Sequence, residues 1–244
     1  MIILINNCAK VKFVKLFFLF IILLILFSCE RNTEFYTECN QYTDVEIDFS
    51  KINRKVIVIG IDGFRSDAMQ LEITPFMHSL INKNNTFYTP NHIVEGITYS
   101  GPNWSSILTG VNLDKHNVTD NSFSEHRYDV FPPFFHYLEL LDHNINTVSI
   151  VNWIPINTYL SSIVADFSPV NTVSDLEVFD NVKNLLLNGD PIYPDVLFIQ
   201  FDELDIAGHS YGFSPNVEEY AAKLTVLDNY VSDIHSIIDS KRLI

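Results

Sequence analysis

Cysteine, positive charge and long apolar runs are all scarce in this 244-residue sequence. It has three cysteines, and two of them, Cys8 and Cys29, fall in the N-terminal export region described below. Cys39 is therefore left without a partner, which excludes an internal disulfide framework. The 15 basic residues face 30 acidic ones, and the net charge of -15 disfavours binding to nucleic acid, duplexes included. The sequence also has no internal repeat and no low-complexity segment.

The N-terminus has the order of an export signal. Three lysines precede an apolar run, Leu16 to Phe27, whose 12 residues fall short of the about 20 that a spanning helix needs. Leu26-Phe27-Ser28-Cys29 resembles the bacterial lipobox, in which the cysteine is lipidated and becomes the new N-terminus. We therefore expect residues 1–28 to be a lipoprotein-type signal peptide and Cys29 to anchor the protein to a membrane of the cell envelope. An ordinary signal peptide or an uncleaved anchor is the alternative.

The mature chain is even more acidic, because residues 1–28 hold three of the 15 basic residues and none of the 30 acidic ones. Its net charge is -18, so a protein acting on phosphate esters would need local positive charge from metal ions. Residues 29–54 are polar without clear periodicity and are interpreted as a tether. Residues 55–244 form the expected folded domain, since a chain with 47% hydrophobic residues can bury a sizeable core.

Runs of β-branched and aromatic residues predict three strands buried on both faces, at 55–61, 147–151 and 195–201. Helical patterns separate them, at about 75–83, 102–109, 133–143 and 174–188, and a last amphipathic helix is predicted to begin at Ser214-Pro215. This alternation predicts an α/β domain with a mostly parallel sheet and helices on both faces.

Acidic residues follow two of these strands. Asp62 comes after the first, and Asp205-Ile206-Ala207-Gly208-His209 comes after the third. Ligands of open α/β sheets bind beyond the carboxyl ends of strands, so these side chains are expected to share one crevice. A carboxylate and a neutral imidazole in one short loop, with Gly208 allowing a tight backbone, suit a cation such as zinc. The alternatives are that Asp62 caps a turn and that His209 only caps or packs.

A hydroxyl is expected at the N-terminus of a helix. Ser100 precedes Gly101-Pro102 and an apolar helical turn, where the helix dipole and free backbone N–H groups favour an anion and help to ionise a hydroxyl. An ordinary N-cap serine is the alternative. Thr98 is the second candidate nucleophile.

Four segments in this order resemble the type I phosphodiesterase and nucleotide pyrophosphatase branch of the alkaline phosphatase superfamily, over about residues 55 to 240. The matching segments are Asp62-Gly63-Phe64-Arg65, the run from Ser100 to Gly110, Asn121 at the spacing of the asparagine that follows a His-Gly-type turn in the family, and Asp205 with His209 and Gly212. The resemblance implies an alkaline phosphatase-like fold and hydrolysis of small phosphate esters, including nucleotides.

The resemblance also implies a ligand set for two divalent metal ions, zinc in this family. Asp62 and Ser100 would hold one ion, and Asp205 and His209 the other. Ser100 would attack phosphorus as an alkoxide, and water would later cleave the phosphoserine intermediate. Asn121 and the backbone N–H near Gly101 would hold a non-bridging oxygen.

Two departures from the family pattern matter. Trp104 stands where a formylglycine sulfatase needs arginine, which argues against a sulfatase. The family's later Asp-His-Gly segment and final histidine do not occur before Ile244, so each ion would have two protein ligands. We therefore expect the chain as written to bind metal weakly and to be nearly inactive. Another ester hydrolase of the superfamily and a non-catalytic surface lipoprotein remain as alternatives, and nothing in the sequence indicates the oligomeric state.

Overall fold

The computed structural model describes residues 55–94 and 96–241. The predicted signal peptide (1–28), the tether (29–54) and the anchor at Cys29 lie outside these residues. Within the described ranges, none of the helices combines the length and the apolar character needed to cross a bilayer.

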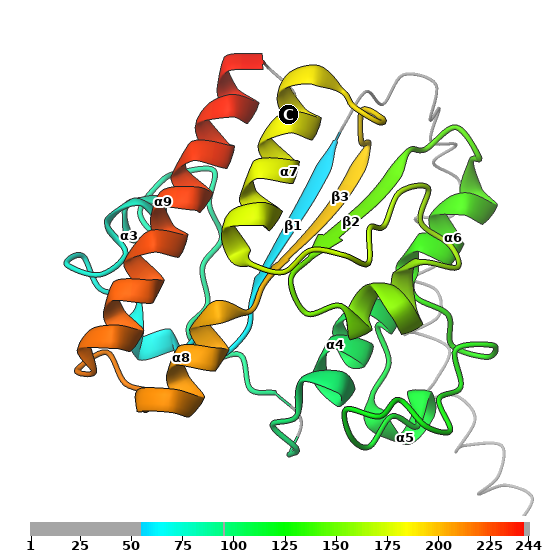
Figure 1. Cartoon of the computed structure of the whole chain (residues 1–244), viewed down its shortest axis with the longest axis horizontal. Helices are drawn as coiled ribbons and strands as arrows, with labels where there is room; N and C mark the ends of the chain where they lie inside the picture. The colour runs from blue at the N-terminus through cyan, green and yellow to red at the C-terminus, as the bar shows by residue number, and fades with distance from the viewer. Residues whose placement is uncertain (1–54, 95, 242–244) are drawn as a thin grey trace, which may run out of the picture. The chain divides into compact units, whose positions relative to one another are not determined.

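Three strands and a set of helices alternate along the chain (Figure 1). The strands are β1 (Val56–Ile61), β2 (Thr147–Val151) and β3 (Val196–Phe201). The α-helices are α3 (Pro75–Leu80), α4 (Ser100–Thr109), α5 (Leu113–His116), α6 (Phe134–Leu141), α7 (Asp175–Asn188), α8 (Glu203–Tyr211) and α9 (Glu218–Lys241). A 3-10 turn, η3 (Ser66–Ala68), follows β1, and a π-helical turn, η4 (Asn157–Ser161), follows β2.

The three strands form a parallel sheet in the order β1-β3-β2. Ile61 at the end of β1 pairs with Phe201 at the end of β3, and Val151 at the end of β2 pairs with Gln200. This register brings the three carboxyl ends to one edge of the sheet, where functional groups of α/β proteins gather. The predicted parallel α/β fold is confirmed, with each strand boundary within one residue of the prediction.

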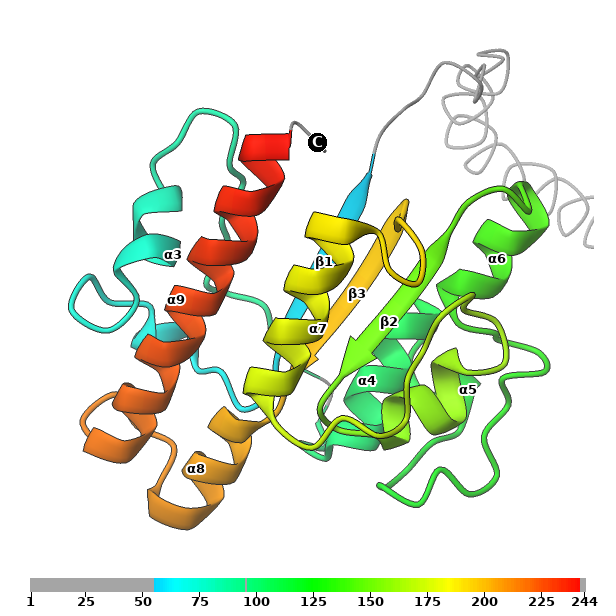
Figure 2. The same ribbon diagram turned by 45° about the horizontal axis from the view of Figure 1, so that its top comes forward.

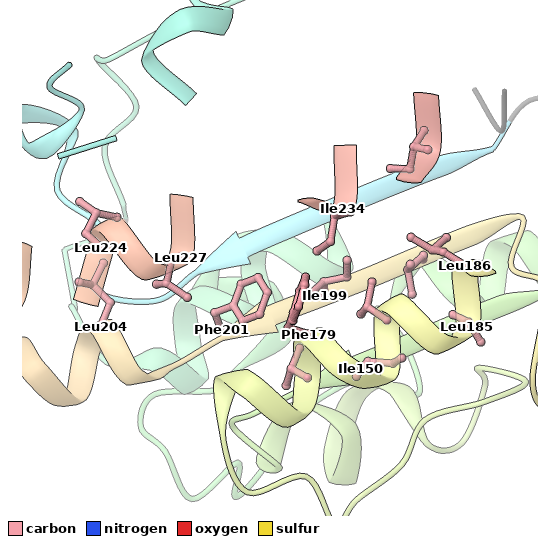
Figure 3. Close-up of a cluster of buried hydrophobic side chains, with 14 of the residues drawn as sticks. Ile150, Phe179, Leu185, Leu186, Ile199, Phe201, Leu204, Leu224, Leu227 and Ile234 are labelled. Carbon is pink, nitrogen blue, oxygen red and sulfur yellow. The ribbon is translucent and has the colours of Figure 1, made fainter. Parts of the chain in front are cut away.

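Helices cover both faces of the sheet, as predicted. Along β3, Leu197 and Ile199 belong to the apolar cluster under α7 and α9, which Figure 3 shows from the side, whereas Phe198 points to the opposite face and packs with Trp104 of α4 and Phe135 of α6. This alternation follows from the two-residue repeat of a strand. Residues of β2 and β3 are buried throughout because both faces are covered.

Helix α9 differs from the prediction at its start and agrees with it along its length. It begins at Glu218 rather than at Pro215, because the backbone of residues 214–217 forms turns first. It is amphipathic as predicted, and its buried apolar face holds Tyr220, Leu224, Leu227, Ile234 and Ile238. A buried carboxylate on the same helix, Asp228, accepts hydrogen bonds from the backbone N–H groups of Phe76 and Met77 (both 2.8 Å) and so caps α3.

Candidate active site

The site candidates gather where β1 and β3 end. Helix α8 continues almost directly from β3, at the lower end of the sheet in Figure 2. Gly63, which follows Asp62, has a φ of +72°, and a Cβ built on it would lie 2.7 Å from the Cα of Asp205. The loop after β1 therefore touches the first turn of α8, and this contact brings Asp62 and Asp205 to the same place.

Both oxygens of the Asp62 carboxylate accept hydrogen bonds. The backbone N–H of Gly63 donates to Oδ1 (2.9 Å), and the indole N–H of Trp104 donates to Oδ2 (2.8 Å). The first bond is the turn-capping contact that the sequence left open as an alternative. The second bond joins the end of β1 to α4, the helix that carries Ser100.

Ser100 is the first residue of α4. The preceding residue, Tyr99, is the N-cap, with extended φ and ψ of -76° and 141°. Ser100 thus lies inside the helix rather than at the N-cap position, so the capping alternative does not describe it. Its partly buried side chain lies at the positive end of a ten-residue helix, which favours an anion there. Thr98 lies two residues before the helix and is exposed.

Asn121 lies directly against the residue after Ser100. The backbone N–H of Gly101 donates to Oδ1 of Asn121 (2.8 Å), and a Cβ on Gly101 would lie 2.6 Å from the carbonyl oxygen of Asp120. A backbone N–H can only donate, so the bonded atom of the amide is its oxygen and its NH₂ group remains able to donate. The Gly101 N–H is already used in this bond, which corrects the expectation that it would hold a substrate oxygen.

Asp205 and His209 lie on a helix, and the expectation of a short loop was wrong. They are one turn apart in α8, with the imidazole Nε2 3.4 Å from Oδ2 of Asp205. Gly208 does not serve a tight turn here. A Cβ at this position would lie 2.2 Å from the ring of Phe213, so the missing side chain makes room for that ring. The His209 side chain is 73% exposed and that of Asp205 is 22% exposed.

Three carboxylates make this edge strongly negative. Burial, followed by the nearby charge of Asp62, raises the pKa of Asp202 to about 7. The same two causes raise the pKa of Asp205, while His209 opposes the shift. Because the charge of Asp62 destabilises the charged forms of Asp202 and Asp205, a divalent cation close to these groups would be bound favourably.

The donor types fit zinc, although the set is small. Asp62 and Ser100 supply oxygen ligands on one side, and Asp205 and His209 supply an oxygen and a nitrogen on the other. Within residues 55–94 and 96–241, no group of three or more His, Cys, Asp or Glu side chains is arranged to hold a metal ion.

A buried carboxylate that sequence reasoning missed supports α8. Asp175, in the first turn of α7, is 1% exposed and accepts hydrogen bonds from the backbone N–H groups of Asp202 (2.8 Å) and Glu203 (3.0 Å). Oε1 of Glu203 accepts in return from the Asp175 N–H (3.3 Å). The N-termini of α7 and α8 thus cap each other. In the sequence, Asp175 has only the appearance of an ordinary first-turn acid, because its partners are 27 and 28 residues away.

Comparison with known proteins agrees with the motifs. A family model described as type I phosphodiesterase / nucleotide pyrophosphatase matches residues 56–136. The bis(5'-adenosyl)-triphosphatase ENPP4 of Bos taurus is 25% identical over 201 residues, which cover 74% of this chain and 42% of that protein. Its Homo sapiens counterpart is 23% identical over 206 residues, covering 76% and 43%. The chain therefore spans less than half the length of these relatives.

Solved structures show the same fold. An inactive variant of murine ectonucleotide pyrophosphatase / phosphodiesterase 5 in complex with AMP superimposes with a TM-score of 0.61 and 19% identity, over 78% of this chain and 54% of that one. The human protein superimposes with a TM-score of 0.52 and 16% identity over the same shares. At these sequence identities, the structural similarity shows that the folds are alike and nothing more. The match to the type I phosphodiesterase / nucleotide pyrophosphatase model over residues 56–136 and the similarity to ENPP4 agree with the resemblance that the motifs carry.

Proposed function

We propose that the protein is a metal-dependent hydrolase of phosphodiester or nucleotide pyrophosphate bonds, with Ser100 as nucleophile. The observation that carries the proposal is that the end of β1 and the Asn121 loop are both hydrogen-bonded to the first turns of α4, the helix that Ser100 begins. Helix α4 begins at Ser100, Asn121 is bonded to the next residue, and Asp62 is bonded to Trp104 one turn later. Relatives named as bis(5'-adenosyl)-triphosphatases, and a fold neighbour in complex with AMP, support nucleotides as the substrate class.

Two zinc ions fit the proposal as cofactors. Asp62 and Ser100 would hold one, and Asp205 with His209 the other. When bound, such ions lower the pKa of a hydroxyl and neutralise charge on a phosphoryl group. The net charge of -15 makes this contribution necessary, since an acidic protein otherwise repels phosphate esters.

The side chains then have distinct roles. The Ser100 hydroxyl gives up its proton to solvent and Oγ attacks phosphorus in line with the leaving oxygen. A phosphoserine ester forms as the bond to the leaving group breaks, and the departing oxygen takes up a proton from solvent. Water subsequently breaks the Oγ–phosphorus bond and restores the hydroxyl. Asn121, whose Oδ1 is held by Gly101, directs its NH₂ group to a non-bridging oxygen, where charge increases in the transition state.

The decisive experiment compares Ser100→Ala with Ser100→Thr and Thr98→Ala, at saturating zinc and with bis-nitrophenyl phosphate as substrate. The wild-type chain is expected to turn over slowly, and Ser100→Ala should abolish this turnover, as expected for the loss of a nucleophile. Ser100→Thr keeps a hydroxyl at the same place and should retain activity, and Thr98→Ala should resemble the wild type. Equal turnover by Ser100→Ala and the wild type would exclude Ser100 as nucleophile.

The substrate class is tested on the wild-type protein alone. The proposal predicts faster hydrolysis of the nitrophenyl diester than of nitrophenyl phosphate or nitrophenyl sulfate. A preference for the monoester would identify another ester hydrolase of the superfamily. Binding of the diester without turnover at saturating zinc would favour a non-catalytic binding protein.

Export and lipid attachment at Cys29 are a part of the proposal that rests on the sequence. Mass spectrometry of protein purified from membranes should find an acylated N-terminus at Cys29 and no residues 1–28. The variant Cys29→Ser should leave the membrane fraction. An unmodified Cys29 in the membrane-bound protein would contradict this assignment.

A further inference from the structure

The indole ring of Trp104 packs against β1 and β3 near the carboxyl end of the sheet. Its ring is 6% exposed, and a Cβ added to Gly60 of β1 would lie 2.3 Å from the ring atom Cη2. On its other side the ring meets Phe198 of β3 edge to face, with centroids 5.9 Å apart and an interplanar angle of 78°. Gly60 therefore provides the space that the indole occupies, and the indole has little freedom to turn.

The fixed ring gives its N–H group a defined direction. The indole nitrogen is a donor only, and it donates to Oδ2 of Asp62 at 2.8 Å while Gly63 holds Oδ1 at 2.9 Å. With one donor on each oxygen, the plane of the carboxylate is set, and each oxygen keeps a lone pair for another partner. Hydrogen bonds of this kind orient carboxylate ligands around metal ions.

We propose that Trp104 is a positioning residue that orients the Asp62 carboxylate toward a divalent cation shared with Ser100. The inference rests on the proposed function and adds a residue to it. Trp104 and Ser100 stand on the same helix, one turn apart, so the bond to Asp62 also fixes the separation of Asp62 and Ser100. The sequence assigned Trp104 only a negative role, as a residue that argues against a sulfatase.

The test is a double-mutant cycle on zinc affinity, measured by competition with a chromophoric chelator. Trp104→Phe keeps a buried ring and removes the N–H, and it should weaken zinc binding by about 10–100-fold. In an Asp62→Asn background the same substitution should change affinity by no more than about 2-fold, because its partner is gone. The control is Trp153→Phe, which makes the same substitution at the other tryptophan of the chain and should bind zinc with wild-type affinity.

Two results of the cycle would overturn the inference. One is equal zinc affinity of Trp104→Phe and the wild type. The other is an affinity loss that persists undiminished with Asp62→Asn, since this would mark a purely structural role. A wild-type chain that binds no zinc would instead overturn the proposed function itself, and this inference with it.

A second measurement keeps the inference testable should Trp104→Phe fail to fold. In Trp153→Phe, Trp104 is the sole tryptophan, because the chain has two. Zinc on Asp62 would withdraw electron density from the carboxylate and weaken its bond to the indole, so the Trp104 emission should shift as zinc is added. Adding Asp62→Asn should abolish the shift. Zinc binding without any change in this emission would contradict the proposal.

Discussion

The α4 side and the α8 side of the candidate site are built differently. On the α4 side, Asp62 is bonded to Gly63 and Trp104, and Asn121 is bonded to Gly101, so the backbone and side chains hold one another. On the α8 side, Asp205 and His209 share a single contact of 3.4 Å, and the histidine is 73% exposed. Packing therefore preorganises the α4 side, whereas a bound cation would complete the α8 side.

The two sides should therefore respond differently to substitution. Changes on the α4 side disturb a network formed without a ligand, so they should affect turnover or folding. Changes on the α8 side remove groups whose main partner would be an ion, so they should affect metal binding and leave the stability of the metal-free protein nearly unchanged. The following predictions test this difference.

Among the substitutions that compare the two sides, Asn121→Ala should have the largest effect. Losing the NH₂ donor should raise the barrier by about 2.7–4 kcal/mol, which is a drop in kcat of about 10²–10³, with zinc affinity unchanged. Asn121→Asp is the matched control, because it keeps the acceptor for the Gly101 N–H but lacks the donor. It should be at least as inactive and equally stable. Steady-state kinetics of both variants measure kcat. An active Asn121→Asp would show that the NH₂ donor is not needed for turnover.

Gly101→Ala should destabilise the fold. The added Cβ would lie 2.6 Å from the backbone oxygen of Asp120, and relieving such a contact costs about 1–3 kcal/mol. Gly96→Ala is the control, since a Cβ at that position meets nothing within 4 Å. Urea unfolding measures both variants. Equal stability of the two would mean that the contact between α4 and the Asn121 loop is loose.

His209→Ala should act on metal binding and spare the fold. We expect zinc affinity to fall by about 10-fold or more, because a ligand matters at least as much as the groups that orient it. The melting temperature without metal should hardly change, since the side chain is mostly exposed. His143→Ala, another exposed histidine paired with a carboxylate, serves as the control. Unchanged zinc affinity in His209→Ala would remove this residue from the ligand set.

The smallest effect is a pH dependence caused by Asp202. Its folded pKa of about 7 lies above the ordinary aspartate value, so the folded state retains a proton that the unfolded state loses between about pH 4 and 7. The free energy of unfolding therefore falls as the pH rises from about 4 to 7, and the contribution of Asp202 to stability is fully present only below this range. Asp202→Asn should gain about 1 kcal/mol over the wild type at pH 8 and nothing at pH 4, a figure that allows for partial exposure.

Zinc sharpens the Asp202 prediction. A cation near Asp62 and Asp205 would cancel the charges that contribute to the raised pKa, so the difference between Asp202→Asn and the wild type at pH 8 should shrink when zinc is added. Urea unfolding across pH, with and without zinc, measures this. Asp233→Asn, an exposed carboxylate on α9, should show no such pattern. A pH-independent effect of Asp202→Asn would contradict the assignment.

Much of the fold could be predicted because its signals are local. The strands were found from continuous β-branched runs, and the apolar face of α9 from its helical spacing. Helix α8 was missed, because Gly208 and the polar residues around it resemble a loop after a strand. Gly208 leaves room for the ring of Phe213 beside this helix, a contact that helical spacing does not reveal.

The sequence by itself determined the three strands, most of the helices between them and the order of the motifs that resemble the family, since each depends on neighbouring residues or on a short pattern. Only the tertiary structure decided which groups meet. The indole of Trp104 finds a carboxylate 42 residues earlier, the Gly101 N–H is taken by an amide 20 residues later, and Asp175 caps a helix that begins after another strand. Such hydrogen bonds depend on the packing of whole elements. An N–H group could be paired with any of several acceptors, and the neighbouring sequence does not show which of them it will meet.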